Sequence, residues 1–68
     1  MDKDWQVVFT GGELYIAEMA KQMLKDNRIE SVIVNKKDSA YPMIGYVEVL
    51  VAPANKPKAE KLIKEFES

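Results

Sequence analysis

The sequence GYVEVLVA, at residues 45–52, is the most apolar of three predicted β-strands and decides how the rest of the chain folds. Valine occupies every second position from Val47 to Val51, which is the two-residue period of a strand that turns one face to a core. Pro53 ends the strand, because proline has no N–H group to donate to a β-ladder. A strand of this kind is expected at the centre of a sheet.

Upstream of it, residues 4–10 predict the first strand of the sheet. Strict alternation directs Trp5, Val7 and Phe9 toward the core. Val8 is then expected on the opposite, exposed face of the sheet.

A helix is predicted to follow this strand directly. The sequence TGGE at residues 10–13 has the pattern of a capping box, with Thr10 as the N-cap and Glu13 three residues later. An apolar arc then continues to about residues 26–28. We expect Asn27 to adopt the left-handed conformation that ends many helices.

The remaining predicted elements are a strand at residues 31–35 and a second amphipathic helix at residues 56–67. The right-handed crossover rule makes the first two strands parallel, with the first helix over the sheet, and the third strand fits between them. The expected fold class is α+β. It is a ferredoxin-like βαββα unit with a three-stranded antiparallel sheet in the order 1-3-2 and two helices on one face. Residues 1–68 form a single domain in this interpretation.

The composition argues against several kinds of site. The 68 residues include no His and no Cys, so we expect no metal, no disulfide and no cofactor. The 10 Lys and Arg residues against 11 Asp and Glu give a net charge of −1, so we expect neither nucleic acid nor a membrane as partner. The apolar runs are too short to span a bilayer, and no apolar signal-peptide core follows residues 1–4. A cytoplasmic location is therefore expected.

We expect no enzymatic activity and assign no catalytic residue. Serine occurs at positions 31, 39 and 68, and none of these lies in a nucleophile-elbow motif. Ser39 with Lys37, or Asp38 with Tyr41, could form a reactive pair in one loop. That loop lacks a base, an orienting residue and a pocket together, so a structural role is the simpler interpretation.

Several short motifs spread over the chain resemble one family. They are Leu14-Tyr15-Ile16-Ala17-Glu18 with Lys21 and Leu24, Trp5 and Val8, Asn35-Lys36-Lys37-Asp38-Ser39-Ala40-Tyr41, and the strand Val47–Val51. With these residues the chain resembles the short prokaryotic signal-transducing proteins of PII-like, ferredoxin-type fold, a bacterial family whose function is not established. The resemblance implies that fold, and it suggests regulation by a ligand or partner.

The chain departs from the family pattern at one position. The family usually has Gly after the Asn at the end of the first helix, whereas Arg28 stands there in this chain. If that position requires a positive φ angle, Arg28 lowers stability by roughly 1 kcal/mol relative to Gly.

The leading functional hypothesis is a non-enzymatic regulatory or protein-interaction module, in signal transduction as the resemblance implies, acting as a homo-oligomer or with a protein partner. Val8, Tyr46 and Leu50 would form its self-association surface, because helices on one face leave the other face of the sheet bare. Two copies could stack these faces or pair the free edge of the first strand. An RNA-binding sheet is disfavoured, since it needs several aromatic platforms and Tyr46 is the single clear candidate.

The alternative hypothesis is a sensor of a small anionic ligand. Two glycines before a helix leave backbone N–H groups that can bind an anion, although the simpler interpretation is a tight turn. The polar loop after the second strand would supply the other half of the site. The residues assigned to it are Gly11, Gly12, Tyr15, Asn35, Lys36, Asp38, Ser39 and Tyr41.

Overall fold

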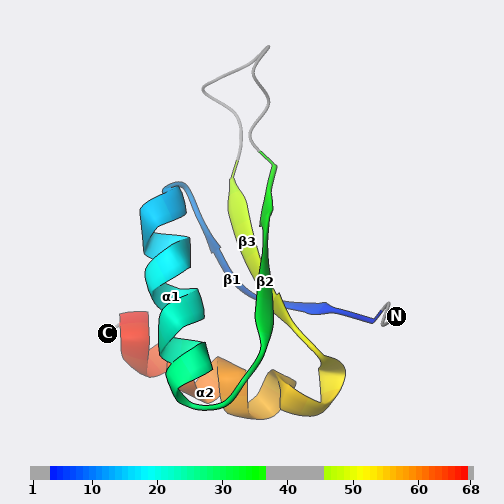
Figure 1. Cartoon of the computed structure of the whole chain (residues 1–68). Helices are drawn as coiled ribbons and strands as arrows, with labels where there is room; N and C mark the ends of the chain where they lie inside the picture. Colours follow the sequence, from blue (N-terminus) through cyan, green and yellow to red (C-terminus); the bar gives the residue numbers. More distant parts are fainter. Residues whose placement is uncertain (1–3, 37–45, 68) are drawn as a thin grey trace.

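A computed structural model of the chain describes residues 4–36 and 46–67 and confirms the predicted fold class (Figure 1). Its elements are β1 (Gln6–Gly11), α1 (Leu14–Asp26), β2 (Ser31–Asn35), β3 (Val47–Val51), a short 3-10 helix (Pro53–Asn55) and α2 (Lys56–Glu67). The strands form one three-stranded sheet in the order β1-β3-β2, and β3 is antiparallel to both neighbours. The fold is therefore the expected α+β arrangement, with β3 at its centre.

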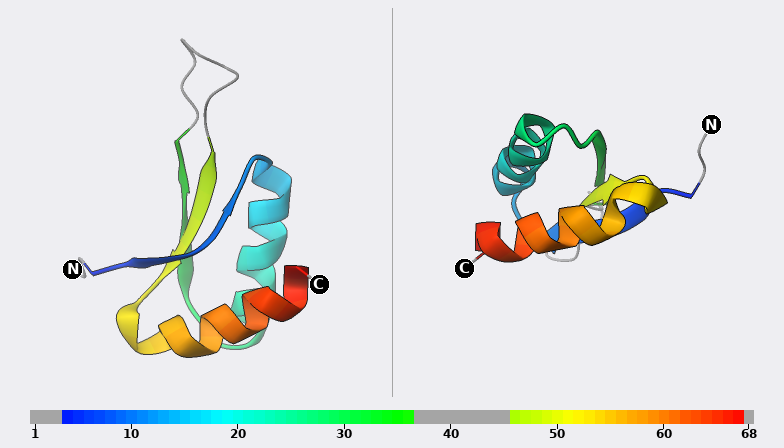
Figure 2. Two further views of the ribbon diagram at one scale, coloured as in Figure 1. Left: turned by 180° about the vertical axis from the view of Figure 1, so that it is seen from behind. Right: turned by 90° about the horizontal axis from the view of Figure 1, so that it is seen from below.

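Both helices contribute to a single core on one face of the sheet. Figure 2 shows α1 alongside the sheet and α2 crossing its lower end, where α2 packs against β1 and α1. The buried hydrophobic residues come from β1, β3, both helices and the α1–β2 turn: Phe9, Ala17, Ala20, Leu24, Ile29, Val47, Val49, Val51, Ala59 and Ile63. The rings of Phe9 and Phe66 meet edge to face, with their centroids 6.3 Å apart, and so join β1 to α2.

The predicted alternation is correct throughout β3, whereas in β1 it is correct at Phe9 and wrong at Val7 and Val8. All three valines of β3 are fully buried. In β1 the register passes from Val7 opposite Leu50 to Phe9 opposite Val49, so Val8 is an extra residue in a β-bulge. Val7 therefore shares the exposed face with Leu50, whereas Val8 packs against the core.

Two apolar side chains, one from the predicted alternation of the first strand and one from the apolar arc of the first helix, lie outside the core. Met19 is 53% exposed on α1, and Trp5 is half-buried ahead of β1, outside the group of side chains that pack against the core. Met23 of α1 and Phe66 of α2 do pack against the core.

The predicted start of the first helix is also wrong. Thr10 and Gly11 still belong to β1, where they pair with Glu48 and Val47, so the sheet uses the residues that resembled a capping box. The helix begins at Leu14, and its N-cap is Glu13 in an extended conformation without a side-chain capping hydrogen bond. Strand pairing has therefore overridden a local capping pattern.

The end of α1 is a Schellman motif. The Arg28 N–H donates to the Lys25 carbonyl oxygen and the Ile29 N–H to that of Leu24, both at 2.9 Å. Arg28 has a φ of 65°, so it, and not the predicted Asn27, takes the left-handed conformation. The Asn27 side-chain amide instead donates to the Met23 carbonyl oxygen at 2.9 Å.

We expect Arg28→Gly to raise the free energy of unfolding by about 1 kcal/mol, because glycine adopts a positive φ angle without steric strain. The midpoint of urea unfolding measures this gain. Arg28→Ala serves as the control, since it removes the same charge but keeps a Cβ atom. If alanine stabilised the protein as much as glycine does, charge and not backbone strain would be the cause.

Candidate functional site

Within residues 4–36 and 46–67, no helix lies on the face of the sheet opposite the core, and this face is largely apolar. We call it the open face. Its residues, assigned from the strand register and from the alternation that continues to Tyr46, are Val7, Thr10, Val32, Val34, Tyr46, Glu48 and Leu50. Leu50 is paired with Val7 on one side and with Val32 on the other, so these three side chains form an apolar row across all three strands. Val7 and Tyr46 are each 40% exposed.

An ion pair neutralises the charge on the open face. The Lys36 Nζ lies 3.7 Å from Oε1 of Glu48, and the Glu48 side chain is 15% exposed. Because Glu48 is largely shielded from water, this pair is screened less than a fully exposed one. The open face therefore offers apolar contact without a net charge that would select a partner of opposite sign.

Two of the three residues predicted for self-association lie on this face. Tyr46 and Leu50 are there, but Val8 packs against the core because of the bulge. Val7, which was predicted to be buried, takes the place of Val8 on the open face. The alternation of the sequence could not reveal this exchange, since valine stands at both positions.

The structure brings part of the predicted ligand site to one end of the sheet. Gly11 and Asn35 both pair with Val47, from the β1 side and the β2 side respectively. They are therefore two strand spacings apart, or about 10 Å. The Lys36 N–H then continues the β2–β3 ladder by donating to the Tyr46 carbonyl oxygen at 2.8 Å.

Other members of that predicted site do not converge in the described structure. Tyr15 is 62% exposed in the first turn of α1. A side chain at Gly12 would meet no atom within 4 Å, whereas one at Gly11 would lie 3.0 Å from the Phe9 ring. Asp38, Ser39 and Tyr41 lie outside the described residues. The anion site between the turn and the loop stays a prediction.

Sequence reasoning missed a second region, at the other end of β2. A hollow of about 420 Å³ there is lined by Lys21, Lys25, Arg28, Ile29, Glu30 and Ser31. The two lysines are exposed residues of α1. The sequence does show the four-residue spacing of the two lysines and the nearby Arg28, which could have indicated a basic site. It does not show that Ser31 points inward, because that direction depends on the sheet register.

Two further observations concern the described ranges. No cluster of three or more His, Cys, Asp or Glu side chains that could hold a metal ion occurs within residues 4–36 and 46–67. Neither helix in these ranges has the length and apolar character needed to cross a bilayer.

Comparison with protein-family models, with curated proteins and with solved structures finds no match to this chain. The resemblance to the prokaryotic signal-transducing proteins therefore stays a prediction from the motifs quoted above.

Proposed function

We propose that this protein is a non-enzymatic protein-interaction module that self-associates through the open face of its sheet. The observation that carries the proposal is the row of Val7, Leu50 and Val32 across the three strands on the face without a helix. Contiguous apolar side chains of this kind on a small domain commonly mark an interface. A short chain also gains from added burial, because a domain of about 60 residues buries only about 60% of its unfolded surface.

A second copy of the chain is the partner that best fits the open face. Packed sheets bury apolar side chains between them at a spacing of about 10 Å, which suits a row of branched side chains. In a symmetric dimer the same face meets itself, so a net charge there would repel. The Lys36–Glu48 ion pair removes this repulsion.

The size of the open face indicates a weak dimer. Three strands about 4.8 Å apart and five residues of about 3.3 Å each give a face of roughly 14 by 17 Å. The area that two such faces bury is below the roughly 1,600 Å² of a standard interface. Association should therefore be reversible and depend on the protein concentration. Such an equilibrium would suit a signalling module that is controlled by its own abundance.

Analytical ultracentrifugation over micromolar to millimolar concentrations tests the proposal. We expect a reversible monomer–dimer equilibrium for the unaltered chain and a monomer for Leu50→Lys, because a lysine in the row places a charge at the contact. Val32→Thr, a milder change in the same row, should weaken association in part. Circular dichroism confirms that both variants are folded.

Met19→Lys is the matched control, since it also replaces an exposed apolar side chain by lysine but lies on α1. It should leave the dimer intact. A monomer at millimolar concentration, or equal weakening by Met19→Lys and Leu50→Lys, would contradict the proposal.

A further inference from the structure

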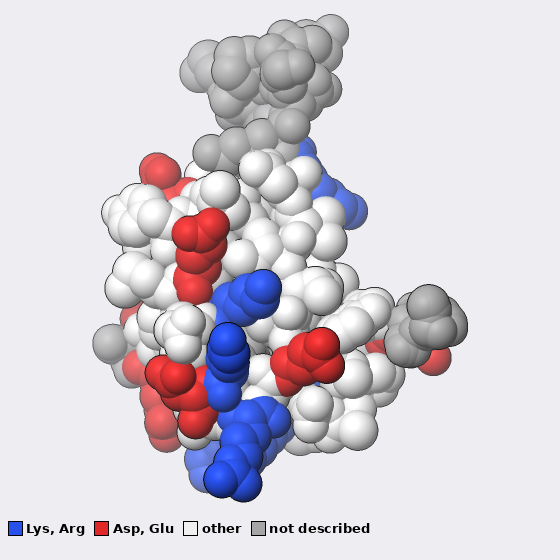
Figure 3. All heavy atoms as spheres, viewed as in Figure 1, with Lys and Arg blue, Asp and Glu red and all other residues white. Residues whose placement is uncertain are grey.

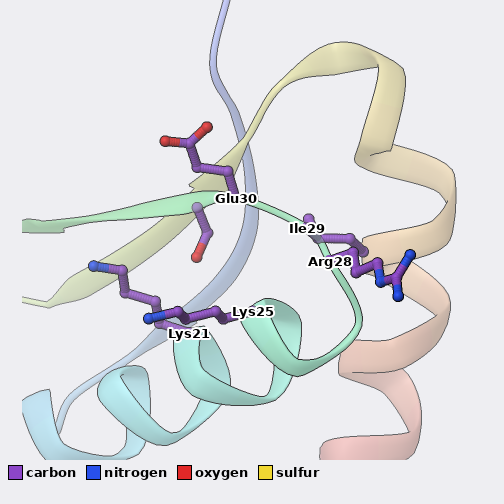
Figure 4. Close-up of a pocket in the computed structure, with 6 residues that line it drawn as sticks. Lys21, Lys25, Arg28, Ile29 and Glu30 are labelled. Atoms are coloured by element: carbon purple, nitrogen blue, oxygen red, sulfur yellow. The ribbon is translucent and has the colours of Figure 1, made fainter.

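The hollow between the second half of α1 and the start of β2 has the chemistry of an anion site. We call it the basic hollow, and its lining residues are Lys21, Lys25, Arg28, Ile29, Glu30 and Ser31 (Figure 4). Its volume of about 420 Å³ lies within the 300–1,000 Å³ that small-molecule pockets typically have. It lies on the helix-covered side of the sheet, so it is independent of the open face.

Three cationic side chains and one carboxylate line the basic hollow. Lys21 and Lys25 are four residues apart on α1 and are therefore neighbours on one helix face. Figure 4 shows their side chains side by side, whereas the Arg28 guanidinium points away from them. Figure 3 shows basic side chains gathered over the lower part of α1. None of the three cations forms an ion pair within the described part of the chain.

The carboxylate among the lining residues does not pair with the lysines in the described structure. Glu30 also lines the hollow, but Figure 4 shows its carboxylate directed away from both lysines. Two like charges at helix positions i and i+4 repel one another when nothing neutralises them. An anion placed between the ammonium groups would remove that repulsion.

Ser31 supplies a second and independent observation. It is the first residue of β2 and is only 6% exposed. Its Oγ is buried and has no hydrogen-bond partner in the described structure. Burying an unpaired hydroxyl is unfavourable, and native structures contain few such groups, so each one calls for an explanation. Because the Oγ is closed to solvent in this structure, an acceptor oxygen of a ligand in the hollow would become its partner after a rotation of the Ser31 side chain toward the hollow.

The basic hollow lies near the C-terminal end of α1, and this end repels an anion less than most helix C-termini do. The C-terminal end of a helix carries partial negative charge on its free carbonyl groups. At the end of α1 the carbonyl oxygens of Leu24 and Lys25 accept backbone hydrogen bonds from Ile29 and Arg28. The Schellman motif thus occupies carbonyl groups that would otherwise repel the ligand.

We infer that the basic hollow binds the phosphoryl group of a small phosphorylated metabolite. Lys21 and Lys25 provide the positive charge, and the Ser31 hydroxyl donates a hydrogen bond to a phosphoryl oxygen. Two unpaired ammonium groups match the double negative charge of a phosphate monoester better than the single charge of a carboxylate, and lysine commonly binds phosphate as a point charge. The remaining volume accommodates the body of the ligand.

Calorimetric and NMR titrations at low ionic strength test this inference with inorganic phosphate, adenosine monophosphate and adenosine. We expect both phosphate compounds to bind, with shifts of the Glu30 and Ser31 amide signals, and adenosine not to bind. Tighter binding of the nucleotide than of inorganic phosphate would identify an ester as the preferred source of the phosphoryl group, and the reverse order would identify free phosphate. The absence of binding by both at millimolar concentration would overturn the inference.

Variants locate the site. Lys21→Gln with Lys25→Gln should weaken binding at least about tenfold, while Lys61→Gln with Lys64→Gln removes the same charge from α2 and should have little effect. Ser31→Ala should weaken binding about fivefold and yet raise the melting temperature by about 4–8 °C, because it removes a buried unpaired hydroxyl. The site would be refuted if the two double lysine variants lost affinity equally, or if Ser31→Ala bound phosphate as tightly as the unaltered chain.

Discussion

Val49→Asp is expected to abolish folding. Val49 is fully buried at the centre of β3, where it is paired with Phe9 on one side and Ile33 on the other. An aspartate at this position would place a carboxylate in an apolar core with no described cation on that face of the strand. An unpaired buried charge lowers stability by several kcal/mol, and a domain of this size has little more than that in total. Circular dichroism and thermal unfolding measure the loss.

Glu48→Gln is the control for this substitution, because Glu48 is the neighbouring residue on the opposite face. It removes a single ion pair with Lys36, which contributes at most about 1 kcal/mol. The variant should unfold cooperatively, close to the temperature of the unaltered chain. A Val49→Asp protein with the same cooperative unfolding would mean that the register of β3 is wrong.

Leu24→Ala is expected to lower the free energy of unfolding by about 2–5 kcal/mol. Leu24 is fully buried in α1, and it belongs with Ile29 to the core cluster. Its carbonyl oxygen also accepts the Ile29 N–H that closes the Schellman motif, so the side chain anchors both the helix and the turn after it. Urea unfolding measures the change, and part of the sample should be unfolded without denaturant.

Met19→Ala is the matched control on the same helix. The Met19 side chain is mostly exposed, and surface substitutions usually change stability by no more than about 0.5 kcal/mol. The two variants should therefore differ by at least about 1.5 kcal/mol. Equal losses would show that α1 is rotated about its axis relative to the described packing.

The fold could be predicted from the sequence wherever the apolar period of a segment matches the way that segment packs in the structure. The alternating valines of β3 and the apolar stripe of α2 gave the correct elements, because a two-residue or a 3.6-residue period survives in the folded chain. Prediction failed where tertiary pairing decides. Thr10 has the chemistry of a helix cap but is paired with Glu48 in the sheet, and no local pattern distinguishes these outcomes.

The candidate sites were predictable only in part, for a related reason. Gly11 and Asn35 lie at the same end of the sheet, because both pair with Val47 from opposite sides, as the strand order implies. The anion site there stays a prediction. The basic hollow could not be predicted, because Lys21 and Lys25 have the ordinary pattern of a solvated helix face. Their significance depends on Ser31, whose inward direction is fixed by its pairing with Val51 across the sheet.

The extra residue at Val8 has a consequence for how sequences of this fold should be aligned. Val7 is already opposite Leu50 and Phe9 opposite Val49, so a chain that lacked residue 8 would keep both pairings in a regular ladder. Deletion of this one residue would therefore leave all the remaining side chains of β1 on their present faces. The same deletion inside β3 would exchange the two faces of the central strand. The number of residues can thus change by one at position 8 of β1 without a change of faces, whereas in β3 it cannot.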